Sequence, residues 1–256
     1  MSGNSNRSRW LVRAEAVYRK AFASCYCDRA KSIQITEFPK SGGSWIGDML
    51  SELLQVDFPR NRFPTNRSSI FHGHQLRRLP VKNVVVVWRD PRDVMVSWYH
   101  HVIIGNSHVQ PDFVSHCREL AGIQDVEQVQ QNMNSFVKWC FDSPYSPKFS
   151  WCDFYDFWSD KDCHAVSYEE MRTSPAITLK RLGESVSGRT FEAEETQRVV
   201  DMHSFERKSG RKSGNEDKAA FLRKGIVGDW ENYFDAAALD TLMSRVGKRL
   251  GKLGYE

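Results

Sequence analysis

A loop rich in glycine and serine follows the first predicted strand of the sequence, Ser32–Phe38. It reads Pro39-Lys40-Ser41-Gly42-Gly43-Ser44-Trp45. Glycines let consecutive backbone N–H groups converge, and the N-terminus of a helix behind them adds partial positive charge. Lys40 adds a mobile cation, and Ser41 and Ser44 add hydroxyl donors. The loop therefore predicts a site for a phosphate or a similar anion, although an ordinary strand-to-helix turn can have the same composition.

The order of residues in this loop differs from that of a Walker A loop. In Walker A the lysine follows the second glycine, whereas here Lys40 precedes both Gly42 and Gly43. The order argues against a γ-phosphate held together with Mg²⁺. A P-loop-like nucleotide kinase or NTPase is therefore kept only as an alternative function.

A second cationic position lies at the end of a valine-rich run. Asp90 can cap the helix that follows, which leaves Arg89 at the carboxyl end of a buried strand. Open parallel sheets bind ligands at that edge, so we expect Arg89 and Lys40 to face the same crevice. Ser97 lies two turns into the helix. The alternative is that Arg89 only pairs with Asp90 or Asp93 and that Ser97 only bonds its own helix.

A third cationic segment precedes the last helix. Within Phe221–Trp230, Arg223 and Lys224 stand side by side and Gly225 follows them. Two cations and a backbone N–H can together bind a second anion. The stretch Glu206–Lys218 before this segment is charged and lacks apolar residues, so we expect a mobile surface loop that becomes ordered on a ligand.

Strands and helices must position these segments. Three runs are typical of buried strands, namely Ser32–Phe38, Val84–Trp88 and His164–Tyr168. Apolar residues at three- and four-residue spacing predict helices at 10–22, 45–54, 91–99, 126–140, 149–158, 175–182, 191–202 and 230–250. The alternation predicts an α/β fold with a central parallel sheet flanked by helices and a P-loop-like strand–loop–helix motif. We expect a single domain over 1–256, with an N-terminal helix within 1–30 packed on it.

Composition limits the class of protein. The chain has 256 residues, of which 40% are hydrophobic and 27% charged, and this excludes disorder of the bulk. A net charge of +4 is far below that of a dedicated nucleic-acid binder. The longest apolar run, Val84–Trp88, is far shorter than the roughly 20 residues of a membrane helix. The 6 cysteines show no Cys-x-x-Cys spacing, so we expect reduced thiols in a cytoplasmic protein.

Taken together, the three segments resemble the signature regions of the cytosolic sulfotransferases. The loop 39–45, Arg89–Ser97 and Arg223–Trp230 stand in the family's order, and the resemblance runs from about Ser32 to Phe234. The family transfers a sulfuryl group in line from 3'-phosphoadenosine 5'-phosphosulfate (PAPS) to a hydroxyl or amine group. The resemblance implies a PAPS-dependent sulfotransferase that releases PAP, requires no metal and acts on a small-molecule acceptor, not on nucleic acid or a membrane.

The resemblance also implies three groups of nucleotide contacts. The residues expected to bind the 5'-phosphate and the bridging oxygen are Lys40, Ser41, Gly42, Gly43 and Ser44. The residues expected to bind the 3'-phosphate are Arg89, Ser97, Arg223, Lys224 and Gly225. Adenine is expected to stack on Trp45, to form a hydrogen bond with Tyr168 and to contact the segment Ser204-Phe205.

A general base is implied at a histidine shortly before the second strand. The chain offers His72 and His74, and alignment on Leu79-Pro80 favours His74, with His72 as the runner-up. A neutral imidazole can take a hydroxyl proton near pH 7. With Lys40 and Ser97, His74 completes the implied catalytic group.

Departures from the family pattern leave other properties open. Gly43 and Ser44 stand where the family usually has two threonines, and the segment after Trp230 departs from the family's dimerisation segment. The oligomeric state is therefore open between monomer and homodimer. A non-catalytic adenosine-bisphosphate or RNA-binding module is the second alternative function, favoured if the histidines lie far from the nucleotide.

Overall fold

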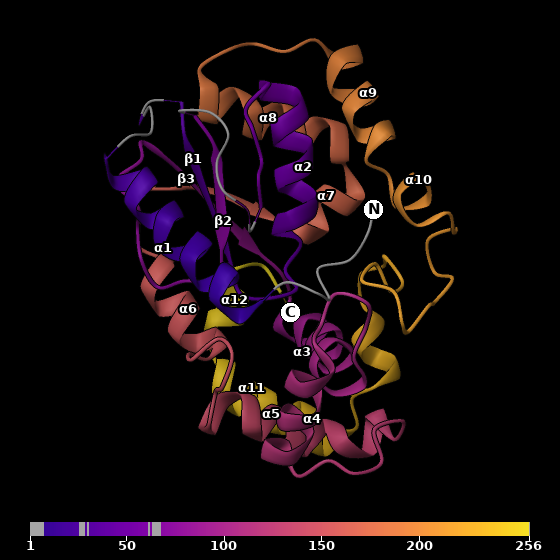
Figure 1. Cartoon of the computed structure of the whole chain (residues 1–256). Helices are drawn as coiled ribbons and strands as arrows, with labels where there is room; N and C mark the ends of the chain where they lie inside the picture. The colour runs from indigo at the N-terminus through magenta and orange to yellow at the C-terminus, as the bar shows by residue number, and fades with distance from the viewer. Residues whose placement is uncertain (1–7, 26–28, 30, 61, 63–67, 256) are drawn as a thin grey trace. The chain divides into compact units, whose positions relative to one another are not determined.

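The computed structural model describes residues 8–25, 29, 31–60, 62 and 68–255, which divide into two compact units (Figure 1). The sheet unit contains the described residues of 8–88 and 161–211. The helical unit contains 89–160 and 212–255. Each unit is described by itself below.

The sheet unit is built on four parallel strands. They are β1 (Ile33–Glu37), β2 (Ile70–Gly73), β3 (Asn83–Trp88) and β4 (His164–Ser167), in the spatial order β2-β1-β3-β4. Ile35 in β1 pairs with His72 on one side and with Val85 on the other. The chain thus reaches the two neighbours of β1 in opposite directions. The carboxyl end of β1 is therefore a topological switch point, where sheets of this kind bind ligands.

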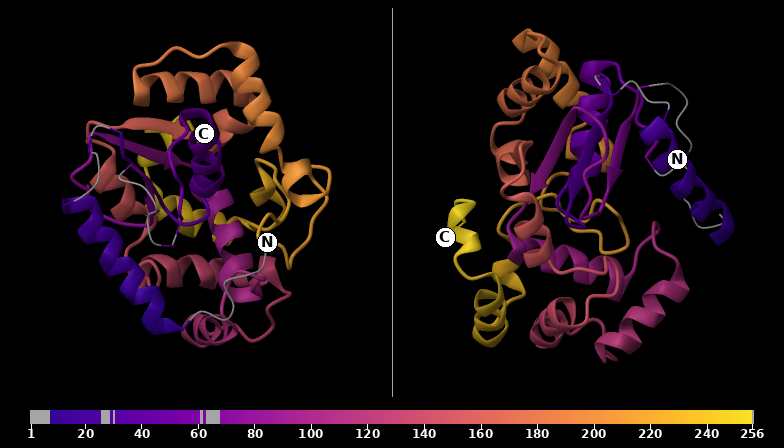
Figure 2. Two further views of the ribbon diagram at one scale, coloured as in Figure 1. Left: turned by 45° about the horizontal axis from the view of Figure 1, so that its top comes forward. Right: turned by 90° about the vertical axis from the view of Figure 1, so that its left-hand side faces the viewer.

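Helices cover the two faces of this sheet. The helices of this unit are α1 (Arg9–Cys25), α2 (Gly43–Leu54), α7 (Tyr168–Thr173), α8 (Pro175–Ser187), α9 (Ala193–Met202) and α10 (Phe205–Ser209). On one face, Ile35 belongs to a buried cluster with Leu50 of α2 and Leu179 of α8. Figure 2 shows α1 on the other side of the strands, where Phe22 lies against Phe71 of β2 with ring centroids 6.3 Å apart. Burial on both faces explains why β1 and β3 consist of buried residues throughout.

The helical unit consists of helices and loops. Its elements are α3 (Pro91–Tyr99), the π-helical turn η2 (His100–Ile104), α4 (Pro111–Ala121), α5 (Val129–Asp142), α6 (Trp151–Trp158), the 3-10 turn η3 (Asp229–Asn232), α11 (Ala236–Val246) and α12 (Arg249–Lys252). The side chain of Asp90 accepts a hydrogen bond from the Arg92 N–H, and Pro91 occupies the first helical position. The predicted start of α3 is therefore confirmed.

The α/β class and the parallel sheet flanked by helices are confirmed. The three predicted strands are β1, β3 and β4. Strand β2 was not predicted, because its four residues Ile70–Gly73 include a histidine and a glycine and are too short to show a period. The single domain over 1–256 stays a prediction.

The packing of the N-terminal helix differs from the expectation. Helix α1 forms, but its residues Trp10, Val17 and Tyr18 are 76%, 68% and 46% exposed. Glu15 is instead buried, at 3%. The apolar spacing therefore located the helix correctly, but only part of the apolar face packs, including Phe22 against Phe71.

The charged stretch 206–218, expected to be a mobile surface loop, begins with a helix, and its mobility stays a prediction. Its first residues belong to α10, whose cap is Ser204 and which ends at Gly210 with φ of 71°. Farther along, Lys218 pairs with Glu127 at 2.6 Å and Glu216 pairs with Arg223. These contacts attach the second part of the stretch to the helical unit.

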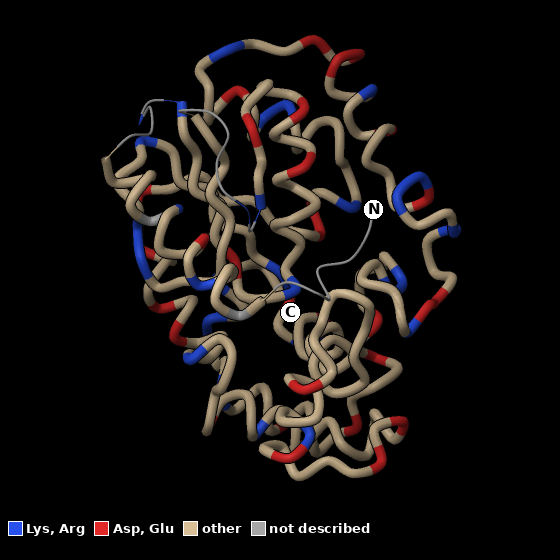
Figure 3. The backbone as a smooth tube through the Cα atoms, viewed as in Figure 1, with Lys and Arg blue, Asp and Glu red and all other residues tan. Residues whose placement is uncertain are grey.

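The charged residues and the cysteines are distributed over both units. Basic and acidic residues are interspersed over the described part of the chain (Figure 3). Cys25, Cys117, Cys140, Cys152 and Cys163 are free thiols, and Cys27 lies outside the described residues. Within the described part of the chain, every helix is too short or too polar to span a bilayer.

Candidate functional site

The glycine loop lies at the switch point of the sheet, between β1 and the N-terminus of α2. Gly42 caps α2 in the left-handed region, with φ of 101° and ψ of 7°. A Cβ atom at Gly42 would lie 2.8 Å from Cδ2 of Tyr168, so glycine is required for both reasons. Lys40 also has a positive φ, 72°, which costs a non-glycine residue about 1 to 2 kcal/mol. Such strain is typical of functional loops.

Three N–H groups of the loop 39–45 already donate within the chain, and that of Trp45 donates to the carbonyl of Gly42 at 3.0 Å. The N–H of Ser41 donates to the carbonyl of Phe38 at 3.2 Å. The N–H of Gly43 donates to Oε2 of Glu37 at 2.5 Å. Ser41 is buried, and Ser44 is partly exposed. A buried carboxylate thus occupies part of the positive N-terminus of α2, where the sequence predicted only an anion ligand.

Glu37 joins this helix N-terminus to two histidines. Its carboxylate is 3% exposed, and its Oε1 lies 2.9 Å from Nε2 of His72. Burial alone would raise the pKa of Glu37, but the His72 bond, the charges of both histidines and the Gly43 N–H together hold that pKa below its ordinary value. Glu37 is therefore ionised at neutral pH and accepts the Nε2–H of His72.

The ring of His74 has a defined tautomer. Its Nδ1 lies 3.1 Å from the backbone carbonyl of Glu37, and because a carbonyl only accepts, Nδ1 carries the proton. The lone pair is therefore on Nε2. Desolvation by the surrounding protein lowers the pKa of His74, and the charges of His72 and Lys40 act in the same direction against that of Glu37. His74 is thus a neutral base within the field of Lys40.

The residues expected at adenine gather in the sheet unit. The rings of Trp45 and Tyr168 meet edge to face, with centroids 6.0 Å apart. Nε1 of Trp45 donates to the carbonyl of His203 at 2.8 Å, which brings Ser204 and Phe205 to the same place. Phe205 is 9% exposed, and the hydroxyl of Ser204 accepts from Arg207. A flat group can contact aromatic faces here.

The other half of the expected site lies in the helical unit, where Asp93 joins two segments. Its two carboxylate oxygens accept the N–H of Gly228 at 2.8 Å and of Trp230 at 3.0 Å. Asp93 also lies 3.8 Å from Arg89. Burial raises the pKa of Asp93, although Arg89 and the two N–H groups oppose the rise. The segment 223–230 is therefore attached to α3, which carries Ser97.

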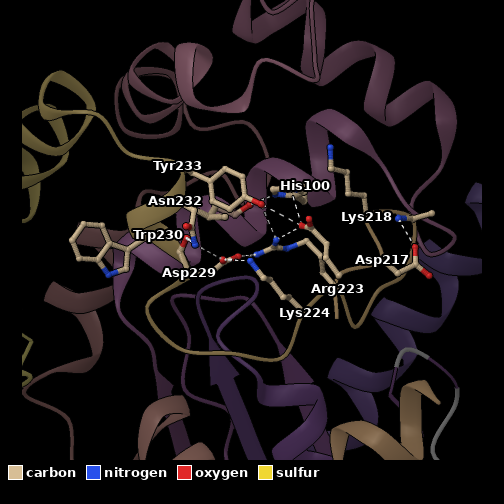
Figure 4. A network of polar contacts seen from close by, with 12 residues as sticks. His100, Asp217, Lys218, Arg223, Lys224, Asp229, Trp230, Asn232 and Tyr233 are labelled. Atoms are coloured by element: carbon tan, nitrogen blue, oxygen red, sulfur yellow. Dashed lines mark hydrogen bonds and ion pairs between the residues drawn. The ribbon is translucent and has the colours of Figure 1, made fainter. Parts of the chain in front are cut away.

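The cations expected at a 3'-phosphate are bound by carboxylates (Figure 4). Asp229 binds both Arg223 and Lys224, the latter at 2.5 Å. Glu216 binds Arg223 as well. These pairs hold the pKa of both carboxyls below their ordinary values despite burial. Gly225, with φ of 66°, follows the two cations in a left-handed turn.

The buried ring of His100 borders this network. Its Nδ1 donates to the Val96 carbonyl at 2.9 Å, and its Nε2 lies 3.8 Å from Oε1 of Glu216. Burial and the charge of Arg223 lower the pKa of His100 to about 4. His100 is therefore neutral at physiological pH.

Each unit brings together part of the residues that the sequence predicted for the site. The sheet unit brings the loop, His74 and the aromatic residues around Trp45 to the end of β1, and the helical unit brings Arg89 near the segment 223–230. Sequence reasoning missed three carboxylates, namely Glu37, Glu216 and Asp229. It named Asp93 only as an alternative partner of Arg89, and the two side chains do lie 3.8 Å apart. A signal existed for Glu37, because a charged residue ends an otherwise buried strand.

The chain belongs to the sulfotransferase family. A sequence model of the sulfotransferase domain matches residues 69–254. This range includes Arg89 and the segment 223–230 and begins after the glycine loop. The family match, together with the curated relatives, identifies the chain as a sulfotransferase of the cytosolic sulfotransferase family.

Named relatives cover most of the chain. It is 24% identical to cytosolic sulfotransferase 3 of Arabidopsis thaliana over 268 residues, covering 88% of this chain and 79% of that protein. It is also 24% identical to human sulfotransferase 2A1, covering 89% of this chain and 87% of that protein. A crystal structure of mouse sulfotransferase SULT7A1 complexed with PAP superposes with a TM-score of 0.67 at 16% identity, covering 94% of this chain and 93% of that one. This last likeness concerns the fold.

Proposed function

We propose that this protein transfers the sulfuryl group of PAPS to a hydroxyl or amine group of a small molecule, with His74 as the general base. The observation that carries the proposal is the tautomer of His74, whose lone pair on Nε2 is fixed by the Nδ1–H bond to the Glu37 carbonyl. The charge of Lys40 acts on the same ring. These observations support His74 as the base and Lys40 as the cation for the leaving oxygen, next to the loop 39–45.

His74 is the better candidate than His72 for a physical reason. Nε2 of His72 is engaged by the ionised carboxylate of Glu37, and its side chain is only 10% exposed. His74 is an exposed residue, although the protein partly desolvates its ring, so an acceptor hydroxyl can approach it. His74 takes the acceptor proton as the S–O bond forms, and Lys40 stabilises the negative charge on the departing bridging oxygen.

The nucleotide contacts of the proposal follow the same groups. Ser41, Gly42, Gly43 and Ser44 bind the 5'-phosphate, Trp45, Tyr168 and Ser204-Phe205 enclose adenine, and Arg89, Ser97, Arg223, Lys224 and Gly225 bind the 3'-phosphate. PAP in the SULT7A1 complex supports this choice of nucleotide for the present chain. A cytoplasmic location and a monomer or homodimer complete the proposal.

The test is transfer of radiolabelled sulfate from PAPS to a panel of phenols, steroids, aliphatic alcohols and amines. His74→Ala should lower turnover by about 10²- to 10⁴-fold while PAP affinity stays within a few-fold. His72→Ala is the neighbouring comparison, and His116→Ala, at an exposed position, is the matched control.

A His74→Ala enzyme that keeps more than a tenth of its rate would move the base to His72 or to water. Phosphoryl transfer from ATP that requires Mg²⁺, in place of sulfuryl transfer, would support the kinase alternative. PAP binding without any transfer would support the non-catalytic module.

A further inference from the structure

We infer that Glu37, His72 and His74 form a binding site for one divalent transition-metal ion of the Zn²⁺ type. Each of the three side chains offers one ligand atom, and these atoms all lie within 4.8 Å of one another. Two imidazoles and one carboxylate form a ligand set that Zn²⁺ takes in proteins, and water supplies the fourth ligand. The inference concerns binding and does not rest on the proposed function.

The distances are close to those that an ion requires. Tetrahedral Zn²⁺ with bonds of about 2.0 to 2.1 Å places its ligand atoms about 3.3 Å from one another. Nε2 of His72 and Oε1 of Glu37 are 2.9 Å apart, so they need to separate by only a few tenths of an ångström. The ion would take the place of the proton between them, which moves to Nδ1 of His72 or to solvent. Small side-chain rotations bring in the third ligand.

The surroundings of the three residues support each ligand. Metal-binding histidines usually donate their other ring N–H to a carbonyl or a carboxylate, which fixes the ring. Nδ1 of His74 makes such a bond to the Glu37 carbonyl at 3.1 Å. Oε2 of Glu37 accepts the Gly43 N–H at 2.5 Å, which orients the carboxylate and leaves Oε1 for the ion.

The framework around the site is rigid and open on one side. Glu37 ends β1 and His72 lies in the neighbouring strand β2, so backbone pairing fixes their separation. His74 follows β2 and is exposed, which gives an ion a path from solvent. The nitrogen ligands favour Zn²⁺ and its neighbours over Mg²⁺ and Ca²⁺, which prefer sites made of oxygen alone.

Zn²⁺ bound at this site would also affect the proposed sulfuryl transfer. Only this effect rests on the proposed function. An ion bound to Nε2 of His74 takes the lone pair that the base needs. Zn²⁺ should therefore inhibit sulfuryl transfer over the same concentration range in which it binds. A chelator should restore the rate.

The experiment is calorimetric titration of the full chain with ZnCl₂ after treatment with a chelator and desalting. The wild-type chain should bind one Zn²⁺ at this site, and Mg²⁺ should not compete. His74→Ala, at an exposed position, and Glu37→Gln, which keeps the shape of the side chain, should each lower the affinity at least tenfold. His116→Ala is the matched control and should leave the affinity unchanged. Circular dichroism checks that each variant is folded.

Cobalt identifies the ligands independently. Co²⁺ bound at this site should give the visible absorption of a tetrahedral ion without a thiolate charge-transfer band. A thiolate band, an absence of saturable Zn²⁺ binding, or equal affinity in the wild type and the His74→Ala variant would overturn the inference. Zn²⁺ binding that His74→Ala abolishes, in a protein without sulfuryl transfer, would instead leave the metal site standing and remove the proposed function.

Discussion

Glu216 should compete with the nucleotide for Arg223. In the structure the Glu216 carboxylate binds the guanidinium, and it also accepts from the Tyr233 hydroxyl at 3.3 Å. A 3'-phosphate that binds Arg223 must displace this carboxylate, because both need the same N–H donors. Asp229 is 2% exposed and holds Lys224 as well, so it stays in place. Replacing Glu216 with Gln should therefore increase the affinity for the 3',5'-bisphosphate.

The expected gain in affinity for PAP follows from the energy of the contact between Glu216 and Arg223. A hydrogen bond between charged groups contributes about 1.5 to 3 kcal/mol. The Glu216 side chain is 26% exposed and the Arg223 side chain is 12% exposed, so water recovers part of that energy when the pair opens. A remaining gain of about 1 to 2 kcal/mol corresponds to about 5- to 30-fold tighter binding of PAP.

Calorimetry with PAP and with 5'-AMP measures this gain. Glu216→Gln should tighten PAP binding and leave 5'-AMP binding unchanged, because 5'-AMP lacks the 3'-phosphate. Glu231→Gln, the same substitution at an exposed position of the helical unit, is the matched control. Equal tightening of both nucleotides, or unchanged PAP affinity, would refute competition at Arg223.

Three further predictions concern stability. Gly42→Ala should destabilise the protein by more than Gly122→Ala, by about 1 to 3 kcal/mol in chemical unfolding, because both positions have positive φ but only Gly42 has a neighbour 2.8 Å from the new Cβ atom. Asp93→Ala should cost about 2 to 4 kcal/mol, since it leaves two N–H groups of the 228–230 turn without their carboxylate; a cost below 1 kcal/mol would contradict its structural role. The folded state lowers the pKa of His100 from 6.5 to about 4, so protonation favours unfolding, and His100 should cost about 2 kcal/mol of stability as the pH falls from 8 to 5. His100→Gln should remove this slope and His116→Gln should not; an unchanged slope in His100→Gln would assign it to other groups.

Local signals made half of the candidate site predictable. A β-branched run, two glycines and a helical period identify β1, the loop and α2 from contiguous residues. Asp90 and Pro91 similarly identify the start of α3. These features depend on neighbours in sequence, and sequence reasoning is reliable for such features.

The remaining features depend on pairing between distant residues. Strand β2 exists because Ile70–Gly73 pairs with β1, and no period within four residues reveals that. The pairing of Glu37 with His72 spans 35 positions, and Asp93 meets Gly228 across 135. Neither partner indicates the other in the sequence, so both contacts required a structure.

The carboxylates that sequence reasoning missed have a common physical cause. An anion site must remain folded before its ligand arrives, and unpaired cations and N–H groups are costly when partly buried. In the sheet unit, Glu37 satisfies the Gly43 N–H at the start of α2. In the helical unit, Glu216 and Asp229 satisfy Arg223. Each carboxylate stabilises the chain without ligand, and Glu216 also lowers the affinity for the proposed 3'-phosphate that must displace it. Under the proposed function, the net binding energy of the nucleotide is therefore the difference between two sets of anion contacts, and substitution of Glu216 should change it more than substitutions at the surface.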